Sequence, residues 1–242
     1  MKIKKPVLIV LGEPNSTFIE ILSKVLNKIS LKKKINFPII LIGSKNLINS
    51  QLKYLKRKIN FIEINKNKTN IQKLKKKIYL INIKYEFNKP FENISMKSRS
   101  YISKCFAKAL GILNVDESNI IINGPISKKD FLNFKFPGIT EYIFNKSKKK
   151  LSKEPTMVIF NKKFSVTPIT THVPLKNVNK IITEKKIINS VLLIDKFYKN
   201  YLKYKPNIAV LGLNPHCETS LKHNEEDKII RPAIKKLINK NI

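Results

Sequence analysis

The sequence predicts an α/β fold with a mostly parallel β-sheet and helices on its faces. Short, continuous apolar runs typical of buried strands alternate with segments whose apolar residues recur at helical spacing. This alternation continues over most of the 242 residues, and it is typical of β-α-β units. The hydrophobic content of 42% is sufficient for a substantial core.

The first half of the chain contains the clearest strand candidates. They are short apolar runs at residues 7–11, 37–42, 59–64, 78–83 and 120–122. Helices are expected where apolar residues recur every three to four positions, at residues 19–29 and 102–110. Gly111 follows the second of these helices and can end it by adopting a left-handed conformation.

The second half begins with a short helical stretch from Ser127. Two further strands are expected at residues 164–169 and 208–213, each of which leads towards a histidine. A long helix with a broad apolar face starts near Thr183, and a last helical segment starts near Glu225. Pro232 must kink that last helix or mark the point where it restarts.

The formal net charge of +33 does not indicate a nucleic-acid-binding protein. Among 49 basic residues only Arg57, Arg99 and Arg231 are arginine, the residue best suited to bidentate recognition of bases and phosphates. The lysines are spread along the whole chain. We therefore interpret them as solvated surface rather than as a binding patch.

Cysteine content and hydropathy predict a cytoplasmic protein with reduced thiols. Cys105 and Cys217 are too few for a disulfide framework and match no paired-cysteine zinc spacing. No apolar run approaches the ~20 residues that a membrane helix needs. The first residues also lack the apolar region of a signal peptide.

Two of the three histidines follow predicted strands at turns that contain proline. They lie in Thr170-Thr171-His172-Val173-Pro174 and in Asn214-Pro215-His216-Cys217. Because the carboxyl ends of parallel strands share one edge, both rings could converge on a metal ion or a substrate. The alternative is a structural histidine, hydrogen-bonded at a strand end. A metal ion would need further ligands, for which His223 is a weaker candidate than water or substrate.

The turn after the first predicted strand, Gly12-Glu13-Pro14, is not a nucleotide-binding motif. It contains one glycine where the Gly-x-Gly-x-x-Gly pattern needs three, so a Rossmann-type pyrophosphate site is not predicted. The chain also lacks a Gly-Lys-Ser phosphate loop and a Gly-x-Ser-x-Gly nucleophile motif. The Glu13 carboxylate is expected to cap the following helix.

Five short motifs occur along nearly the whole chain. They are Leu11-Gly12-Glu13-Pro14, Asn123-Gly124-Pro125-Ile126-Ser127-Lys128, Pro137-Gly138-Ile139-Thr140-Glu141, Thr170-Thr171-His172-Val173-Pro174-Leu175 and Gly212-Leu213-Asn214-Pro215-His216. Their order and spacing resemble those of the 4-hydroxythreonine-4-phosphate dehydrogenase family of vitamin B6 biosynthesis. The resemblance implies a two-domain fold similar to isocitrate and isopropylmalate dehydrogenases, with domains at residues 1–125 and 126–242. It also implies a homodimer whose interface lies in the second domain.

The same resemblance implies a reaction and a set of site residues. NAD or NADP would oxidise 4-phosphohydroxy-L-threonine, and decarboxylation would give 3-amino-2-oxopropyl phosphate on the route to pyridoxal 5'-phosphate. A divalent ion, Zn²⁺, Mg²⁺ or Co²⁺, would be held by His172 and His216 and act as a Lewis acid. Thr140 matches a threonine that contacts the substrate in the family.

The chain departs from the family's pattern at three places. The turn after the first predicted strand lacks the additional glycines that usually follow Gly-Glu-Pro in the family. Ile139 stands where the family's Gly-His-Thr-Glu motif has histidine, which removes a polar substrate contact. The sequence ends at Ile242, so we expect a fold that is incomplete at its C-terminus and lacks a third metal histidine. Two alternatives stay open, a dehydrogenase of a related phosphorylated hydroxy acid such as threonate or erythronate phosphate, and an inactive truncated remnant.

Overall fold

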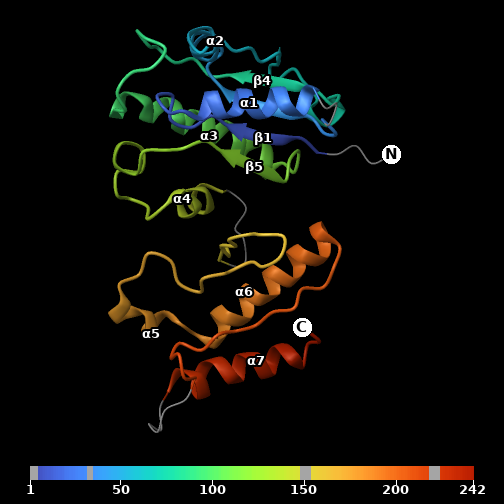
Figure 1. Cartoon of the computed structure of the whole chain (residues 1–242), viewed down its shortest axis with the longest axis vertical. Helices are drawn as coiled ribbons and strands as arrows, with labels where there is room; N and C mark the ends of the chain where they lie inside the picture. The colour runs from blue at the N-terminus through green and yellow to red at the C-terminus, as the bar shows by residue number, and fades with distance from the viewer. Residues whose placement is uncertain (1–4, 32–34, 148–153, 218–223) are drawn as a thin grey trace. The chain divides into compact units, whose positions relative to one another are not determined.

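The computed structural model describes residues 5–31, 35–147, 154–217 and 224–242 (Figure 1). It divides into two compact units, Met1–Lys150 and Leu151–Ile242. The family resemblance implies a boundary between residues 125 and 126. The first unit extends beyond that point because Phe131, Leu132 and Tyr142 are buried in its core.

A five-stranded parallel sheet forms the centre of the first unit, with strand order β3-β4-β2-β1-β5. The strands are β1 (Val7–Val10), β2 (Ile39–Gly43), β3 (Ile62–Glu63), β4 (Ile78–Asn82) and β5 (Ile120–Asn123). All strands expected in the first half of the chain are present, although β3 is shorter than expected. The predicted α/β fold with a parallel sheet is therefore confirmed.

Helices cover both faces of this sheet. Helices α1 (Phe18–Leu31) and α2 (Lys45–Tyr54) pack on one face, and α3 (Arg99–Asn114) and α4 (Ile139–Lys146) pack on the other. Successive strand residues point to opposite faces, so Ile9 joins the α1 and α2 cluster while Leu8 joins the α3 and α4 cluster. Burial on both faces explains why β1, β2 and β4 are continuous apolar runs in the sequence.

The prediction that Gly111 ends α3 is wrong. The helix continues through Gly111 to Asn114, because Ile112 is fully buried and keeps the last turn on the core. The left-handed residue is Asp116, with φ of 59°. Its N–H donates to the Leu113 carbonyl oxygen at 3.0 Å, which satisfies one of the free carbonyl groups at the end of the helix.

The second unit is mainly helical. It contains α5 (Val178–Ile181), α6 (Glu184–Phe197) and α7 (Arg231–Ile238). Helix α6 starts next to Thr183, as the sequence predicts, and the Thr183 hydroxyl caps it by accepting the Lys186 N–H at 3.2 Å. Pro232 lies in the first turn of α7, after a π-helical turn at Glu226–Ile230, so the expected restart of the helix is confirmed.

The two strands predicted for this unit are wrong. Among its described residues, the β-pairing consists of one antiparallel bridge between Ile159 and Val166. Residues 208–213 form no strand, although Ile208 and Val210 pack on the core between α6 and α7. Their apolar pattern reflects this burial rather than strand pairing. No helix in the described parts of the chain is long and apolar enough to cross a membrane.

The turns after β1 and β5 touch each other through their backbones. The Glu13 N–H donates to the Pro125 carbonyl oxygen at 2.8 Å, and the Gly124 N–H donates to the Val10 carbonyl oxygen at 2.8 Å. Gly12 adopts φ of +73°, and a Cβ atom there would lie 2.4 Å from the Pro125 oxygen. Both the conformation and the space at Gly12 therefore require glycine.

We expect Gly12→Ala to lower the free energy of unfolding of the first unit by at least about 2 kcal/mol. A left-handed conformation costs an alanine about 1–2 kcal/mol, and the collision with the Pro125 carbonyl adds to this cost. Urea denaturation followed through the NMR amide signals of β1 and β5 measures the change.

Gly111→Ala is the matched control. Gly111 lies inside α3, and a Cβ atom there would have nothing within 4 Å. Alanine should therefore raise the free energy of unfolding by about 0.5–1 kcal/mol. Unchanged stability of Gly12→Ala would contradict the close approach of the two turns.

Candidate functional site

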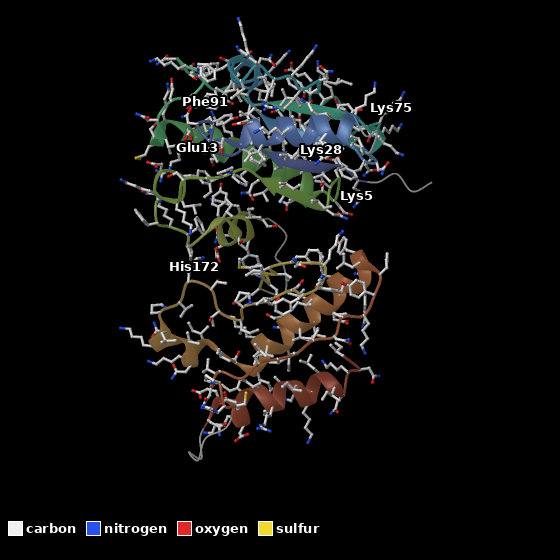
Figure 2. The ribbon with its side chains drawn as sticks, in the orientation of Figure 1. Lys5, Glu13, Lys28, Lys75, Phe91 and His172 are labelled. Carbon is white, nitrogen blue, oxygen red and sulfur yellow. The ribbon has the colours of Figure 1, made fainter. Side chains whose placement is uncertain are left out.

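Glu13 lies in the turn after β1 and is only 2% exposed (Figure 2). Its Oε1 atom accepts the Asn15 backbone N–H at 3.3 Å, and its Oε2 atom accepts the Ser98 hydroxyl at 2.9 Å. Burial raises the pKa of Glu13, and the neighbouring Asp130 raises it further against the effect of these hydrogen bonds. The sequence predicts Glu13 as a cap of α1, but its carboxyl group joins the β1 turn to the start of α3.

Two other buried polar side chains support the same edge of the sheet. The Gln51 amide donates to the carbonyl oxygens of Pro14 at 2.6 Å and Pro90 at 2.8 Å. The Tyr101 hydroxyl accepts the Ser44 N–H at 3.0 Å. The sequence gives no signal for these contacts, because their partners are backbone groups 37 or more residues away.

Thr140 and Ile139 occupy the first turn of α4. Gly138 precedes them in an extended conformation and provides no side-chain cap. Thr140 is exposed, whereas Ile139 is half-buried and packs on the α3 and α4 side of the core. Thr140 is therefore accessible to a ligand, while the neighbouring isoleucine contributes to packing.

His172 and His216 both lie in turns of the second unit, and both are exposed. Figure 2 labels His172, which has a left-handed backbone with φ of 55°. Cys217, directly after His216, is also left-handed with φ of 55°. Because residues 164–169 and 208–213 are not strands, the expectation that His172 and His216 lie at one edge of a parallel sheet is wrong.

The described residues bring no three His, Cys, Asp or Glu side chains together in a way that could hold a metal ion. His223, the third histidine, lies outside the described residues. His172 and His216 belong to the second unit, and Thr140 and Ile139 belong to the first. The exposed imidazoles have donor chemistry that suits a metal ion, but two imidazoles alone would not complete a donor set.

In the sequence, Glu226 is recognisable only as an acidic residue near the start of a helix. The structure buries it to 4% exposure, and its Oε1 atom accepts the N–H groups of Leu213 at 2.9 Å and Asn214 at 2.8 Å. The hydrogen bond from the Asn214 backbone, with the other backbone donors, holds the pKa of Glu226 below its usual range. The turn that carries His216 is thus attached to a charged carboxylate.

The fold belongs to the class of α/β folds with an isocitrate-dehydrogenase-like architecture. A solved 4-hydroxythreonine-4-phosphate dehydrogenase from Klebsiella pneumoniae superposes with a TM-score of 0.75 at 21% identity, over 99% of this chain and 73% of that chain. A terephthalate 1,2-cis-dihydrodiol dehydrogenase from Burkholderia xenovorans LB400 superposes with a TM-score of 0.65 at 14% identity, over 99% of this chain and 72% of that chain.

The sequence identifies the family within this class. The family described as pyridoxal phosphate biosynthetic protein PdxA matches residues 34–242. A 4-hydroxythreonine-4-phosphate dehydrogenase from Sulfurihydrogenibium sp. (strain YO3AOP1) is 36% identical over 233 residues, which are 95% of this chain and 69% of that protein. The Aquifex aeolicus (strain VF5) protein of the same name is 28% identical over 239 residues, with the same coverage of both chains. The chain belongs to the PdxA family.

The buried carboxyl group of Glu13 predicts a specific pH dependence of stability. Because its pKa is higher in the folded than in the unfolded chain, the folded chain binds this proton more tightly. The wild type should therefore lose stability relative to Glu13→Gln as the pH rises from the ordinary value of 4.5 through the folded-state pKa. Urea denaturation of the first unit across the acid-to-neutral range measures the difference.

Glu86→Gln is the control for this experiment, because Glu86 is exposed in the same unit. If the stability difference between wild type and Glu13→Gln stays constant with pH, the pKa of Glu13 is not raised in the folded chain.

Proposed function

We propose that this chain carries out the NAD(P)-dependent oxidation and decarboxylation of 4-phosphohydroxy-L-threonine in pyridoxal 5'-phosphate biosynthesis. The product would be 3-amino-2-oxopropyl phosphate. The observation that carries this proposal is the family match over residues 34–242, which includes both histidine motifs. A cytoplasmic location stays a prediction that accords with this metabolic role.

The residues that we propose to bind the substrate lie in the first turn of α4. We assign the exposed Thr140 hydroxyl to substrate binding, since it can both donate and accept a hydrogen bond. Ile139 offers no such group and packs on the core instead. This difference from the family's histidine favours keeping the related phosphorylated hydroxy acids, threonate and erythronate phosphate, as second candidate substrates.

His172 and His216 are the residues that we propose to bind a divalent ion, Zn²⁺, Mg²⁺ or Co²⁺. Their imidazoles are exposed, and neutral imidazole is a common ligand for such ions. When bound, a divalent ion supplies Lewis-acid chemistry that favours loss of the hydroxyl proton. The donor set needs at least one further ligand from outside the pair.

The turn after β1 does not resemble a pyrophosphate site. Its Glu13 N–H is already bonded to the Pro125 carbonyl, and the Glu13 carboxyl group lies beside it. A phosphate group at this turn would meet few free N–H donors and a carboxyl group. We therefore assign no residue of this turn to NAD or NADP.

We also propose a homodimer formed through the second unit. An apolar cleft of about 690 Å³ lies along α6 and is lined by Val158, Phe160, Leu192, Leu193 and Phe197, among others. Phe160 is 49% exposed and Phe197 is 40% exposed. A second copy of the chain that covered this cleft would remove both rings from water.

Cofactor reduction with 4-phosphohydroxy-L-threonine, measured during titration with each divalent ion, tests the proposed activity. We expect metal-dependent reduction of NAD or NADP. His172→Ala and His216→Ala should each lower the metal affinity at least about tenfold, measured by calorimetry. Threonate and erythronate phosphates, assayed in parallel, test the second candidate.

Cys217→Ser is the matched control, because Cys217 is exposed beside His216 and should not affect metal affinity. Equal metal binding by wild type and both histidine variants would refute the proposed site. If the wild type turns over threonate or erythronate phosphate but not 4-phosphohydroxy-L-threonine, the second candidate is favoured. If the wild type binds the metal ion but turns over none of these substrates, an inactive chain is favoured.

Sedimentation velocity tests the proposed dimer. Phe197→Asp places a charge in the apolar cleft and should convert a dimeric wild type to monomers. Phe134→Asp is the control, since Phe134 is 83% exposed and lies in the first unit. An unchanged sedimentation coefficient for Phe197→Asp would contradict this interface.

A further inference from the structure

The turn that carries His216 is held by a carboxylate that no sequence motif links to it. Glu226 follows His216 by ten positions and opens the π-helical turn before α7. One oxygen of its carboxylate accepts the two successive N–H groups of Leu213 and Asn214. A charged acceptor makes these hydrogen bonds stronger than those between neutral groups.

The connection continues from Asn214 to the histidine. The Asn214 Oδ1 atom accepts the His216 N–H at 3.0 Å, and the Asn214 carbonyl oxygen accepts the Cys217 N–H at 2.9 Å. These two bonds close the turn around Pro215 and fix the backbone of His216. The backbone conformation of His216, from which its imidazole ring projects, is therefore fixed by Asn214. The backbone of Asn214 is in turn held by its hydrogen bond to Glu226.

The packing around Gly212 leaves little freedom for this arrangement. A Cβ atom at Gly212 would lie 3.2 Å from the Glu226 Oε1 atom and 2.6 Å from the Cys217 Sγ atom. The carboxylate thus lies directly against the backbone at the start of the turn. A glycine here allows the carboxylate and the turn to approach each other.

Glu226 is itself fixed by the core of the second unit. Ile230 and Ala233, which follow it on the π-helical turn and α7, are buried with Ile187 and Val191 of α6. The carboxylate is therefore anchored to packed helices. The described residues of the His216 turn have no strand pairing, and the hydrogen bonds to Glu226 attach the turn to this core.

We propose that Glu226 is a positioning residue that fixes the Asn214–Cys217 turn and thereby orients His216 for ligand binding. That Glu226 fixes this turn is a statement about the structure of the chain. That His216 binds a ligand rests on the proposed function. Glu226 acts through Asn214 and touches no ligand.

The test compares Glu226→Ala and Glu226→Gln in the full chain. Alanine removes both acceptor contacts, whereas glutamine keeps one oxygen that can accept them. Glu225→Ala is the matched control, because it removes a neighbouring carboxylate that is less buried. NMR hydrogen exchange and heteronuclear relaxation of the backbone amides provide readouts that need no metal and no activity.

In Glu226→Ala, the Leu213 and Asn214 amides should exchange about tenfold faster or more, as expected for loss of a hydrogen bond to a charged group. The His216 amide should become more mobile, while the amides of α7 stay protected. Glu226→Gln should recover most of the protection, and Glu225→Ala should behave as wild type. Equal loss of protection in α7 would show a general structural role and overturn the proposal.

Calorimetric titration with Co²⁺ then connects the turn to ligand binding. Glu226→Ala should lower Co²⁺ affinity about tenfold, and Glu226→Gln should lower it less. If His216→Ala binds Co²⁺ as well as wild type, the proposed metal site fails while the exchange experiment still decides the role of Glu226. If His216→Ala loses affinity and Glu226→Ala does not, the positioning role fails alone.

Discussion

The close backbone approach between the turns after β1 and β5 is the constraint on which the first unit depends. No side chain fits between Gly12 and the Pro125 carbonyl, so the two turns pack directly and extend the pairing of β1 with β5. The same approach uses the Glu13 N–H and leaves the Glu13 carboxyl group buried against Ser98. The carboxyl edge of the sheet, where ligands of open α/β sheets bind, is thereby connected to the start of α3 by a hydrogen bond.

Each unit holds one of its turns with a buried carboxyl group, but the pKa values of the two groups are shifted in opposite directions. Glu13 accepts one backbone N–H and one hydroxyl, and burial dominates, so its pKa rises. Glu226 accepts two backbone N–H groups, and these donors dominate, so its pKa falls. The balance between burial and hydrogen bonding therefore decides the direction in which each pKa moves.

The sequence predicts the first unit well because its strands are buried by helices from the same stretch of chain. The period of the apolar residues then reflects both the secondary structure and the packing. In the second unit, Ile208 and Val210 are apolar because they pack on α6 and α7, and an apolar run alone does not distinguish such a segment from a strand. The histidine turns were recognisable from His172 and His216 beside proline. Glu226 was not, because its partners are set by tertiary packing.

Under the proposed function, the residue at position 139 affects the choice of substrate more than the architecture of the sheet does. Neighbours with the same fold carry different names and act on different compounds, so the fold alone does not determine the substrate. A buried or half-buried polar side chain discriminates strongly between substrates that can and cannot pair with it, whereas an apolar side chain discriminates weakly. Ile139 turns this position towards the core and leaves Thr140 as its polar neighbour. Under the proposed function, position 139 therefore makes no polar contact with the substrate, and recognition at the start of α4 depends on the polar residues that follow it.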